Sequence, residues 1–370
     1  MKRLLIAAAG TGGHVFPALA VALELRARGW EVLWLGTSEG RLESKVVPAA
    51  GFELLSLPVQ GLRGHGLLRK LQAPWQLLRA WWQCRQWLRE RQVQLVLGFG
   101  GYVAGPVGVA ARSLGIPLLC HEQNARAGLT NRQLQRFAQA QFVGFAGALR
   151  DLPKAEVVGN PLRAEVLAVA AQARTKQPQA VSVSQPLQLL VVGGSLGARA
   201  LNEQVPLALA KLAAQGIAMQ VVHQCGQHQL STVQAAYQQA GLSAVTVVEF
   251  IDDMASAYAA ADLVICRAGA LTVAEIAAIG VAAIFVPLPH AVDDHQTANA
   301  ESLVSVGAAK LVPQGTHVID FNERLTATIE ALLSRPERLQ QMAAAARQAA
   351  HLNATAAVVE AVEQWSHYEG

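Results

Sequence analysis

Charged residues are scarce in this sequence. Asp, Glu, Lys and Arg make up 15% of its 370 residues, whereas hydrophobic residues make up 52%. Intrinsically disordered chains show the opposite balance, with high net charge and few apolar residues. The composition therefore excludes a disordered chain, and because the length exceeds what one ordinary core supports, it favours two folded domains.

Cysteine is also rare, and none of Cys84, Cys120, Cys225 and Cys266 forms a CxxC pair. This favours neither a zinc site nor a disulfide framework and is typical of a reducing compartment. No apolar run approaches the roughly 18 residues of a membrane span. The apolar stretch from Leu4 to Ala9 is short and leads into a glycine turn, so we interpret it as a buried strand and not as a signal peptide. We expect a protein that is soluble or lies on a membrane surface.

Several familiar motifs are missing. The sequence has no Walker A lysine loop, no D-x-D metal pattern, no HExxH and no G-x-S-x-G elbow. We therefore expect no tightly bound metal and no cofactor. The first glycine turn, AAAGTGGHVFP at 7–17, also fails the G-x-G-x-x-G dinucleotide pattern, because Val15 occupies the last position. His14 belongs to neither phosphate-loop pattern.

What the sequence does have is a repeated strand, glycine turn and helix. RLLIAAA (3–9) reads as a strand, and a helix follows from Val15 with Pro17 in its first turn. The same device recurs at 94–115 and restarts at 187–199. Further strands are predicted at WEVLWLG, IPLLCHEQN, MQVVHQCG, VTVVEFID, DLVIC and VAAIFVPLP. This alternation predicts an α/β fold with two Rossmann-like domains whose parallel sheets face a central cleft.

Three polar clusters follow strands in the first half. The turn Gly10–His14 exposes backbone N–H groups at a helix N-terminus, which suits an anion, and His14 is able to take a proton near neutral pH. A tight turn with a capping histidine is the alternative. The glycines at 98–105, beside Tyr102, either form a flexible ligand-binding turn or allow close packing of a strand against a helix. HEQN at 121–124 is either a ligand-binding cluster or a solvated loop.

The second half has its own clusters. GGSLGAR (193–199) offers Ser195 to a phosphate, and RAGALTVAE (267–275) opens a helix whose first residues expose backbone donors. Glu275 is suited to hold a ribose diol, or it is the glutamate of a capping box. DDHQTAN (293–299) is a further dense polar run after a strand.

The charge is unevenly distributed. Residues 1–160 carry 19 Lys and Arg against 9 Asp and Glu, a balance of +10, and the remainder is −6, which gives the total of +4. Residues 54–91 combine seven basic residues, one acid and four of the seven tryptophans. Basic, Trp-rich amphipathic helices lie in membrane interfaces. A helix packed on its own domain is the alternative, and no motif supports nucleic acid.

Together these motifs resemble the MurG family, the UDP-N-acetylglucosamine–N-acetylmuramyl-(pentapeptide) pyrophosphoryl-undecaprenol N-acetylglucosamine transferases. The resemblance spans nearly the whole chain. It is carried by the order of GTGGHVFPALA, GFGGYVAGP, HEQN, VVGNPLR, GGSLGAR, EFIDDM, GALTVAE, and DDHQ followed by NA. Ala9, Ala268 and Ala282 depart from the family pattern, and the 164–186 insert is longer than the fold requires.

The resemblance implies a GT-B fold and an inverting transfer of GlcNAc from UDP-GlcNAc to the muramyl 4-hydroxyl of lipid I, giving lipid II for peptidoglycan synthesis. It implies His14 as the general base and places Gly100, Gly101 and Tyr102 on the acceptor side. Positions that match the family's UDP-GlcNAc-binding residues are Thr11, Gly12, Gly13, Asn124, Arg163, Ser195, Ile251, Ala270, Leu271, Thr272, Val273, Ala274, Glu275 and Gln296.

The resemblance also implies domain roles. Residues 1–160 would form the acceptor and membrane-binding domain, joined by a C-terminal helix from about 345 to 370, and 161–344 would bind UDP-GlcNAc. The stretch at about 338–365 is strongly helix-forming, and we expect this helix to cross back to the first domain. Partners would be UDP-GlcNAc, lipid I, an anionic membrane surface and complexes of cell-wall synthesis or division. The protein would sit on the cytoplasmic face of the bacterial plasma membrane. Membrane-docking candidates are Leu68, Arg69, Lys70, Trp75, Arg79 and Trp82.

Two rival functions stay open on the residues alone. One is another GT-B transferase, such as a diacylglycerol glycosyltransferase, which would share the fold and the membrane face. The other is a nucleotide-sugar-binding membrane module without turnover. His14, Glu275 and Gln296 argue against the second.

Overall fold

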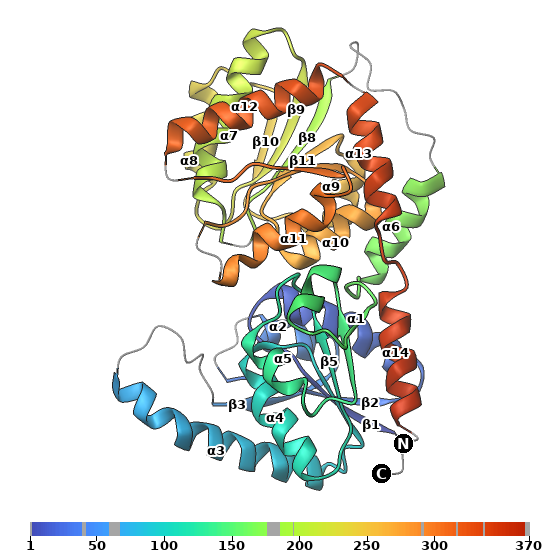
Figure 1. Cartoon of the computed structure of the whole chain (residues 1–370). Coiled ribbons are helices and arrows are strands. Elements are labelled where there is room, and N and C mark those ends of the chain that lie inside the picture. Colours follow the sequence, from blue (N-terminus) through green and yellow to red (C-terminus); the bar gives the residue numbers. More distant parts are fainter. Residues whose placement is uncertain are drawn as a thin grey trace. The chain divides into compact units, whose positions relative to one another are not determined.

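The chain divides into two compact units. In this computed structural model the described residues are 2–38, 42–58, 67–175, 186–194, 196–289, 292–315, 317–335 and 337–366, and side chains are described at all of these except 67–74, 174–175 and 292. Unit 1 comprises Met1–Arg163 and His351–Gly370, and unit 2 comprises Ala164–Ala350. Each unit contains its own sheet (Figure 1).

Unit 1 is built on seven parallel strands in the order β3-β2-β1-β4-β5-β6-β7. The strands are β1 (Arg3–Ala7), β2 (Glu31–Thr37), β3 (Glu53–Leu57), β4 (Leu95–Gly98), β5 (Leu118–Glu122), β6 (Ala140–Val143) and β7 (Glu156–Val157). The helices are α1 (Gly12–Ala27), α2 (Glu43–Ala49), α3 (Leu67–Glu90), α4 (Gly101–Ser113), α5 (Leu129–Leu134), the 3₁₀ turn η1 (Ala146–Arg150) and α14 (Ala354–Trp365).

Helices cover both faces of this sheet because β1 is apolar on both sides. Leu4 and Ile6 pack in one core with α1 and α14, whereas Leu5 and Ala7 pack in another with α3 and α4. Successive side chains of a strand point to opposite faces, so an unbroken apolar run fits a sheet that is buried on both faces.

The C-terminal stretch is two helices and not one. α13 (Glu337–Gln348) belongs to unit 2, and α14 packs on α1 of unit 1 through Val358, Val359 and Val362. Asn353 is the N-cap of α14 and its carbonyl accepts the N–H of Ala357 at 2.9 Å. The predicted continuous helix at 338–365 is therefore interrupted between Gln348 and Ala354.

Unit 2 has six parallel strands in the order β10-β9-β8-β11-β12-β13. The strands are β8 (Leu187–Val192), β9 (Met219–Gln224), β10 (Val245–Val248), β11 (Leu263–Cys266), β12 (Ala282–Phe285) and β13 (Ala309–Leu311). The helices are α6 (Ala164–Thr175), α7 (Arg199–Ala214), α8 (Leu230–Gln239), α9 (Met254–Ala260), α10 (Ala270–Ile279), η2 (Val292–Asp294), α11 (His295–Val304), α12 (Val318–Leu333) and α13.

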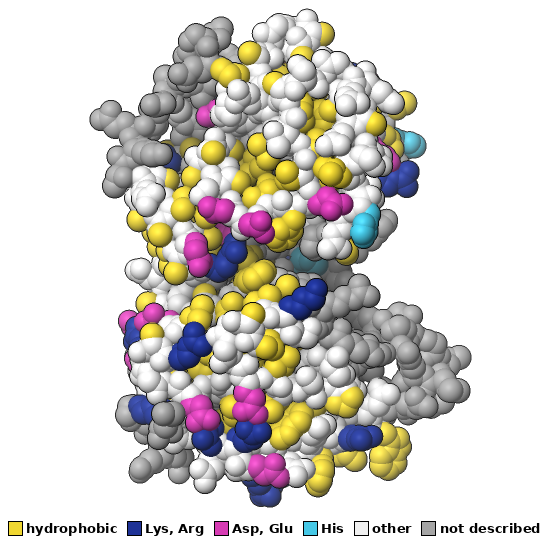
Figure 2. Space-filling view, turned by 180° about the vertical axis from the view of Figure 1, so that it is seen from behind, with side chains coloured by type: hydrophobic (Ala, Val, Ile, Leu, Met, Phe, Trp, Pro, Cys, Tyr) yellow, Lys and Arg dark blue, Asp and Glu magenta, His cyan; other side chains and the backbone are white. Residues whose placement is uncertain are grey.

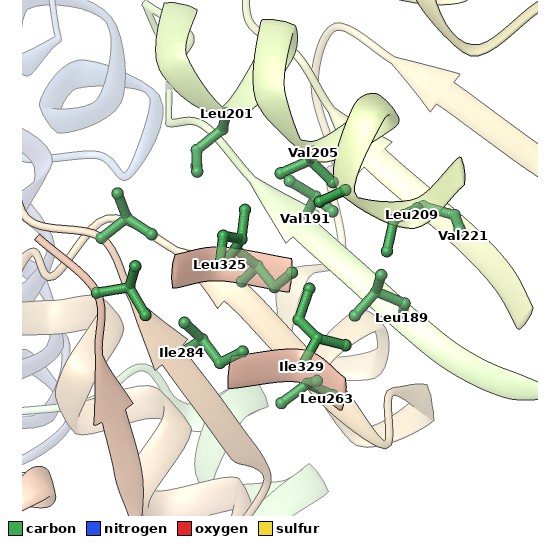
Figure 3. Packing of buried hydrophobic residues seen from close by; sticks show 14 of the residues in the cluster. Leu189, Val191, Leu201, Val205, Leu209, Val221, Leu263, Ile284, Leu325 and Ile329 are labelled. Atoms are coloured by element: carbon green, nitrogen blue, oxygen red, sulfur yellow. The ribbon is translucent and has the colours of Figure 1, made fainter. Parts of the chain in front are cut away.

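One face of this second sheet packs against α7 and α12. Leu189 and Val191 of β8 share a core with Leu201 and Val205 of α7 and with Leu325 of α12 (Figure 3). The core side chains alternate along β8, as they do along β1 in unit 1. The two halves of the chain therefore repeat one construction.

The predicted strands are present, most of them with shorter limits, and four strands were not predicted. These four, β3, β6, β7 and β13, have two to five residues each. The first helix begins at Gly12 and not at Val15, so Pro17 lies in its second turn. Among the described residues, no helix is both long and apolar enough to span a membrane.

A buried histidine in unit 2 is held neutral by its surroundings. His223 on β9 has its Nδ1 2.8 Å from the Tyr237 hydroxyl and its Nε2 3.1 Å from Asn202 Oδ1. Burial lowers the pKa of His223 to about 3, because the protonated ring loses its hydration there.

This histidine predicts a loss of stability in mild acid. The unfolded chain protonates it near its ordinary pKa of about 6.5, while the folded chain does not, so the stabilisation present above pH 6.5 is lost as the pH falls toward about 3. From pH 7.5 to pH 5 the contribution should amount to roughly 2 kcal/mol of unfolding free energy. Urea titrations of the wild type and of His223→Gln measure it. Equal pH dependence in both proteins would contradict the prediction.

Candidate functional site

In both units the strand order reverses beside the first strand. Chains leaving β1 and β4, or β8 and β11, turn to opposite faces of their sheet. In open α/β sheets, ligands commonly bind beyond the carboxyl ends of the strands at such a reversal. Each of the four strands is followed by a glycine-containing turn and a helix. The candidate residues of each unit gather at this edge.

The first turn connects β1 to α1 through a residue that favours glycine. Gly10 has a φ of +96°, and Thr11 is the N-cap of α1, its carbonyl accepting the N–H groups of His14 and Val15 at 3.0 and 3.2 Å. Gly12 and Gly13 therefore lie in the first helical turn, where backbone N–H groups have no partner within the helix. The imidazole of His14 is half-buried, with Nδ1 3.2 Å from Thr11 Oγ1.

The turn after β4 lies against this first turn. Gly100 has a φ of +81°, and a Cβ atom placed on it would lie 3.6 Å from Cδ2 and Nε2 of His14. Gly101 begins α4, followed by Tyr102, whose side chain is 37% exposed. The structure thus brings Gly100, one of the predicted acceptor-side residues, next to His14.

The HEQN segment at the end of β5 is a buried polar network and not a solvated loop. Nε2 of His121 lies 2.8 Å from the Gly159 carbonyl, and Nδ1 lies 3.0 Å from the Gln123 amide nitrogen. Burial lowers the pKa of His121 to about 4, so the ring is neutral at physiological pH. This histidine therefore supports the loop structurally.

Glu122 shapes the loop that carries Asn124. Its Oε1 accepts the Asn124 backbone N–H at 3.0 Å, and its Oε2 accepts the Gly128 N–H at 3.0 Å and the Asn131 side-chain amide at 2.8 Å. Only Asn124 of the four HEQN residues is partly exposed. The buried members hold the backbone, which leaves Asn124 as the candidate for ligand contact.

Arg163 is placed beside the first helix. Its guanidinium carbon lies 5.2 Å from the centre of the Phe16 ring on α1, which is cation–π distance. Unit 1 contains the catalytic candidate and five of the donor-binding candidates, namely His14, Thr11, Gly12, Gly13, Asn124 and Arg163. The remaining donor-binding candidates belong to unit 2.

In unit 2 the turn after β8 is held by a glutamine that the sequence motifs did not single out. Gln224 Oε1 accepts the Gly194 N–H at 2.9 Å, and its Nε2 donates to the Gly194 and Glu249 carbonyls at 3.0 and 2.7 Å. Gln224 ends β9, thirty residues after the turn, so no local signal identifies it. Ser195 lies outside the described residues.

The turn after β11 leads into α10 through Gly269, its N-cap. The first helical residues, Ala270, Leu271 and Thr272, occupy positions whose N–H groups lack helical partners. Glu275 is the sixth residue of α10 and is buried. A capping box places its glutamate third, where Thr272 stands, so the capping-box interpretation of Glu275 is wrong.

α11 and β12 support this turn. The buried amide of Asn299 donates to the Ala268 carbonyl at 3.1 Å, and Arg267 donates to the Val286 and Pro287 carbonyls, both at 3.0 Å.

The other donor-binding candidates of unit 2 lie close to this turn in the chain or at the same edge of the sheet. Gln296 Oε1 accepts the Leu288 N–H at 3.0 Å. Ile251, partly buried, follows β10 at the same edge of the sheet, and Val273 and Ala274 lie within α10.

Helix α3 has two apolar faces. Ala80, Cys84 and Leu88 are buried in the core shared with α4, whereas Trp75 and Trp82 are 75% and 61% exposed. The packed-helix interpretation is therefore right for one face only. Figure 2 shows hydrophobic side chains next to Lys and Arg side chains at the lower edge of unit 1.

The other membrane candidates are less completely described. Arg79 is exposed. Leu68, Arg69 and Lys70 lie within α3, but their side chains are outside the described part. Across the described residues, no group of three His, Cys, Asp or Glu side chains is arranged to hold a metal ion.

Known proteins resemble this chain over nearly its full length. Residues 4–143 match the glycosyltransferase family 28 N-terminal domain, and residues 188–359 match the C-terminal domain of that family. A UDP-N-acetylglucosamine--N-acetylmuramyl-(pentapeptide) pyrophosphoryl-undecaprenol N-acetylglucosamine transferase from Aeromonas hydrophila is 52% identical over 97% of this chain and 96% of its own length. The protein of the same name from Idiomarina loihiensis is also 52% identical, over 97% of each chain.

Comparison with solved structures leads to the same family. The crystal structure of Acinetobacter baumannii MurG has a TM-score of 0.80 and 43% identity, and the match covers 98% of this chain and all of that one. A UDP-GlcNAc 2-epimerase from Neisseria meningitidis, at 15% identity and a TM-score of 0.69, shares the fold alone. With its two Rossmann-like units and these relatives, the chain belongs to glycosyltransferase family 28, has the GT-B fold, and is a member of the MurG family within it.

Proposed function

We propose that this protein transfers GlcNAc from UDP-GlcNAc to the 4-hydroxyl of the muramyl sugar of lipid I, forming lipid II and UDP. The observation that carries the proposal is 52% identity, over 97% of the chain, to enzymes named for this reaction. The turns at the carboxyl ends of β1, β4, β8 and β11 supply the groups that such a transfer needs.

His14 is the general base of the proposed mechanism. If Nδ1–H donates to Thr11 Oγ1 across the 3.2 Å contact, the lone pair of the ring lies on Nε2. Nε2 then takes the proton of the muramyl 4-hydroxyl as its oxygen attacks C1 of GlcNAc. The C1–O bond to the diphosphate breaks, its electron pair leaves with UDP, and the configuration at C1 inverts. Gly100, Gly101 and Tyr102 border the acceptor beside this histidine.

Unit 2 binds the nucleotide in this proposal. The N–H groups at the start of α10, with the hydroxyls of Ser195 and Thr272, contact the diphosphate, where the helix dipole favours its charge. Glu275 holds the ribose, and the backbone of Ile251 contacts uracil. By the family resemblance, Ala270 and Gln296 contact the sugar. The other positions that match donor-binding residues of the family are Asn124, Thr11, Gly12, Gly13 and Arg163.

The exposed face of α3 is the proposed membrane contact. Trp75 and Trp82 expose large apolar surface beside basic residues, a composition suited to an anionic lipid surface. Lipid I is anchored in the membrane by its undecaprenyl chain, so an enzyme that uses it must work at the surface. We therefore place the protein peripherally on the cytoplasmic face of the plasma membrane, where complexes of cell-wall synthesis and division are further partners.

The deciding experiment measures UDP release from UDP-GlcNAc with three acceptors. The proposal expects turnover with a lipid I analogue and none with diacylglycerol or with no acceptor. Turnover with diacylglycerol alone would favour the rival lipid glycosyltransferase. UDP-GlcNAc binding without release of UDP under any condition would favour a non-catalytic module.

Loss of His14 should impair chemistry more than folding. A general base contributes about 10²–10⁴-fold to the rate, so His14→Ala should lower kcat at least about 100-fold at an unchanged melting temperature. His317→Ala is the matched control, because His317 is exposed at the start of α12 in unit 2. Near-normal kcat in His14→Ala would remove the base assignment.

Loss of Glu275 should weaken donor binding selectively. A hydrogen bond to a charged group contributes about 1.5–3 kcal/mol, so Glu275→Ala should raise the KM for UDP-GlcNAc about tenfold or more. The KM for the lipid I analogue should change by less than about twofold. Glu301→Ala, an exposed carboxylate on α11, is the control. A larger effect on the acceptor KM would place Glu275 elsewhere.

Two sets of substitutions in α3 should separate the parts of membrane binding. Replacing Arg69, Lys70 and Arg79 by Glu should abolish binding to anionic vesicles at low salt, since each basic residue contributes about 1 kcal/mol there. Trp75→Ser with Trp82→Ser should weaken the binding that survives high salt at least about tenfold, because it removes apolar insertion.

The vesicle experiment has its own control. Leu207→Ser removes a leucine that is 51% exposed in unit 2 and should leave flotation with vesicles unchanged. Both α3 variants should keep their affinity for UDP. If neither α3 variant alters flotation, the membrane contact lies on another surface.

A further inference from the structure

A buried glutamate lies directly beneath the first glycine turn. Glu43 is the first residue of α2, and none of its surface is exposed. Glutamate is almost never fully buried without partners, because its polar group loses hydration. A glutamate at this depth therefore requires an explanation from the groups around it.

The partners of Glu43 come from two strand ends. Its Oε1 accepts the hydroxyl of Thr37, the last residue of β2, at 2.9 Å, and its Oε2 accepts the backbone N–H of Gly10 at 3.3 Å. Thr37 is itself buried, whereas Gly10 and Thr11 are exposed. The glutamate thus ties the inner side of the exposed turn to β2.

The surroundings leave space for this side chain. A Cβ atom on Gly36 would come within 3.0 Å of Glu43 Cγ, so a larger residue at position 36 would displace the glutamate. Earlier in the turn, the Ala8 N–H donates to the Leu35 carbonyl at 3.2 Å, and the Ala8 carbonyl accepts Nε1–H of Trp34 at 2.8 Å. Two hydrogen bonds from β2 and one from Glu43 therefore fix residues 8–10.

We propose that Glu43 is a positioning residue for the transfer, which fixes the direction of the first turn by drawing the Gly10 N–H inward. The inference rests on the proposed function. With Gly10 held, the chain passes through Thr11 into α1, so that Gly12 and Gly13 present their N–H groups outward and the His14 ring is set beside Gly100. Glu43 contacts no substrate and acts through this turn.

Three substitutions in the full chain test the role. Glu43→Met fills a similar space but accepts no hydrogen bond. Glu43→Asp keeps the carboxylate on a side chain one methylene shorter. Glu43→Gln keeps the length, offers its carbonyl oxygen to the Gly10 N–H, and donates its amide to the Thr37 hydroxyl. Asn322→Leu is a control that removes a buried, hydrogen-bonded side chain of α12 in unit 2.

We expect kcat for UDP release with a lipid I analogue to fall about tenfold to 100-fold in Glu43→Met and Glu43→Asp, as displaced catalytic groups do. Glu43→Gln should stay within about threefold of wild type, because it retains both hydrogen bonds. The Kd for UDP should stay within about twofold in all three variants. Asn322→Leu should lower the melting temperature and leave kcat unchanged. A general loss of stability would not produce this pattern.

Amide hydrogen exchange of the segment 8–14 gives a readout that does not depend on turnover. Exchange should be faster in Glu43→Met and Glu43→Asp than in wild type, and unchanged in Glu43→Gln. Wild-type kcat in the Met and Asp variants, or equal losses in Gln and Met, would overturn the proposal. If Glu43→Met does not fold, the Asp and Gln variants decide the question. If the wild type releases no UDP with lipid I, the proposed function fails, while exchange still shows whether Glu43 holds the turn.

Discussion

The structure depends on one constraint, that parallel strands bring all their carboxyl ends to the same edge of a sheet. Where the strand order reverses, between β1 and β4 and between β8 and β11, the chain leaves toward opposite faces of the sheet, the usual position of ligand sites in open α/β sheets. Helices α1, α4 and α10 begin there, α1 with a glycine and the other two just after one, with backbone N–H groups that no helical carbonyl satisfies. Those candidate residues for ligand binding that the structure describes lie at or beside one of these edges.

Such turns consist largely of glycine and have little stiffness of their own, because glycine has the greatest backbone freedom to lose. Buried polar side chains from neighbouring elements supply the stiffness. Glu43 holds Gly10, Gln224 holds Gly194, and Asn299 holds the Ala268 carbonyl. Each of these side chains satisfies a main-chain group of its turn, so support of the turn and stability of the fold depend on the same hydrogen bonds.

The glycine turns could be predicted from the sequence, but the buried side chains that hydrogen-bond to them could not. Strands such as β1 and β11 are apolar runs followed by glycine, a local signal. The contacts of Glu43 and Gln224 join residues about thirty positions apart, and with one sequence nothing links them. β7 has only two residues, too few for a pattern. For α3, periodicity indicated an amphipathic helix, but only packing showed that both faces are apolar and that one of them is covered.

The two halves of the chain use charge in different ways. Residues 1–160 carry +10 and the rest −6, yet the nucleotide, itself anionic, is assigned to the acidic half. Net charge cannot attract it there at physiological salt, since exposed charges are screened beyond about 8 Å. In the proposed function, nucleotide binding in unit 2 would then depend on dipoles aimed at short range, such as the N–H groups at the start of α10. The positive charge of unit 1 is suited instead to an extended anionic surface, where many weak attractions add. In the proposed function, the N–H groups at the start of α10 would therefore select the donor. The net positive charge of residues 1–160 would bring the protein to the membrane that contains its lipid acceptor.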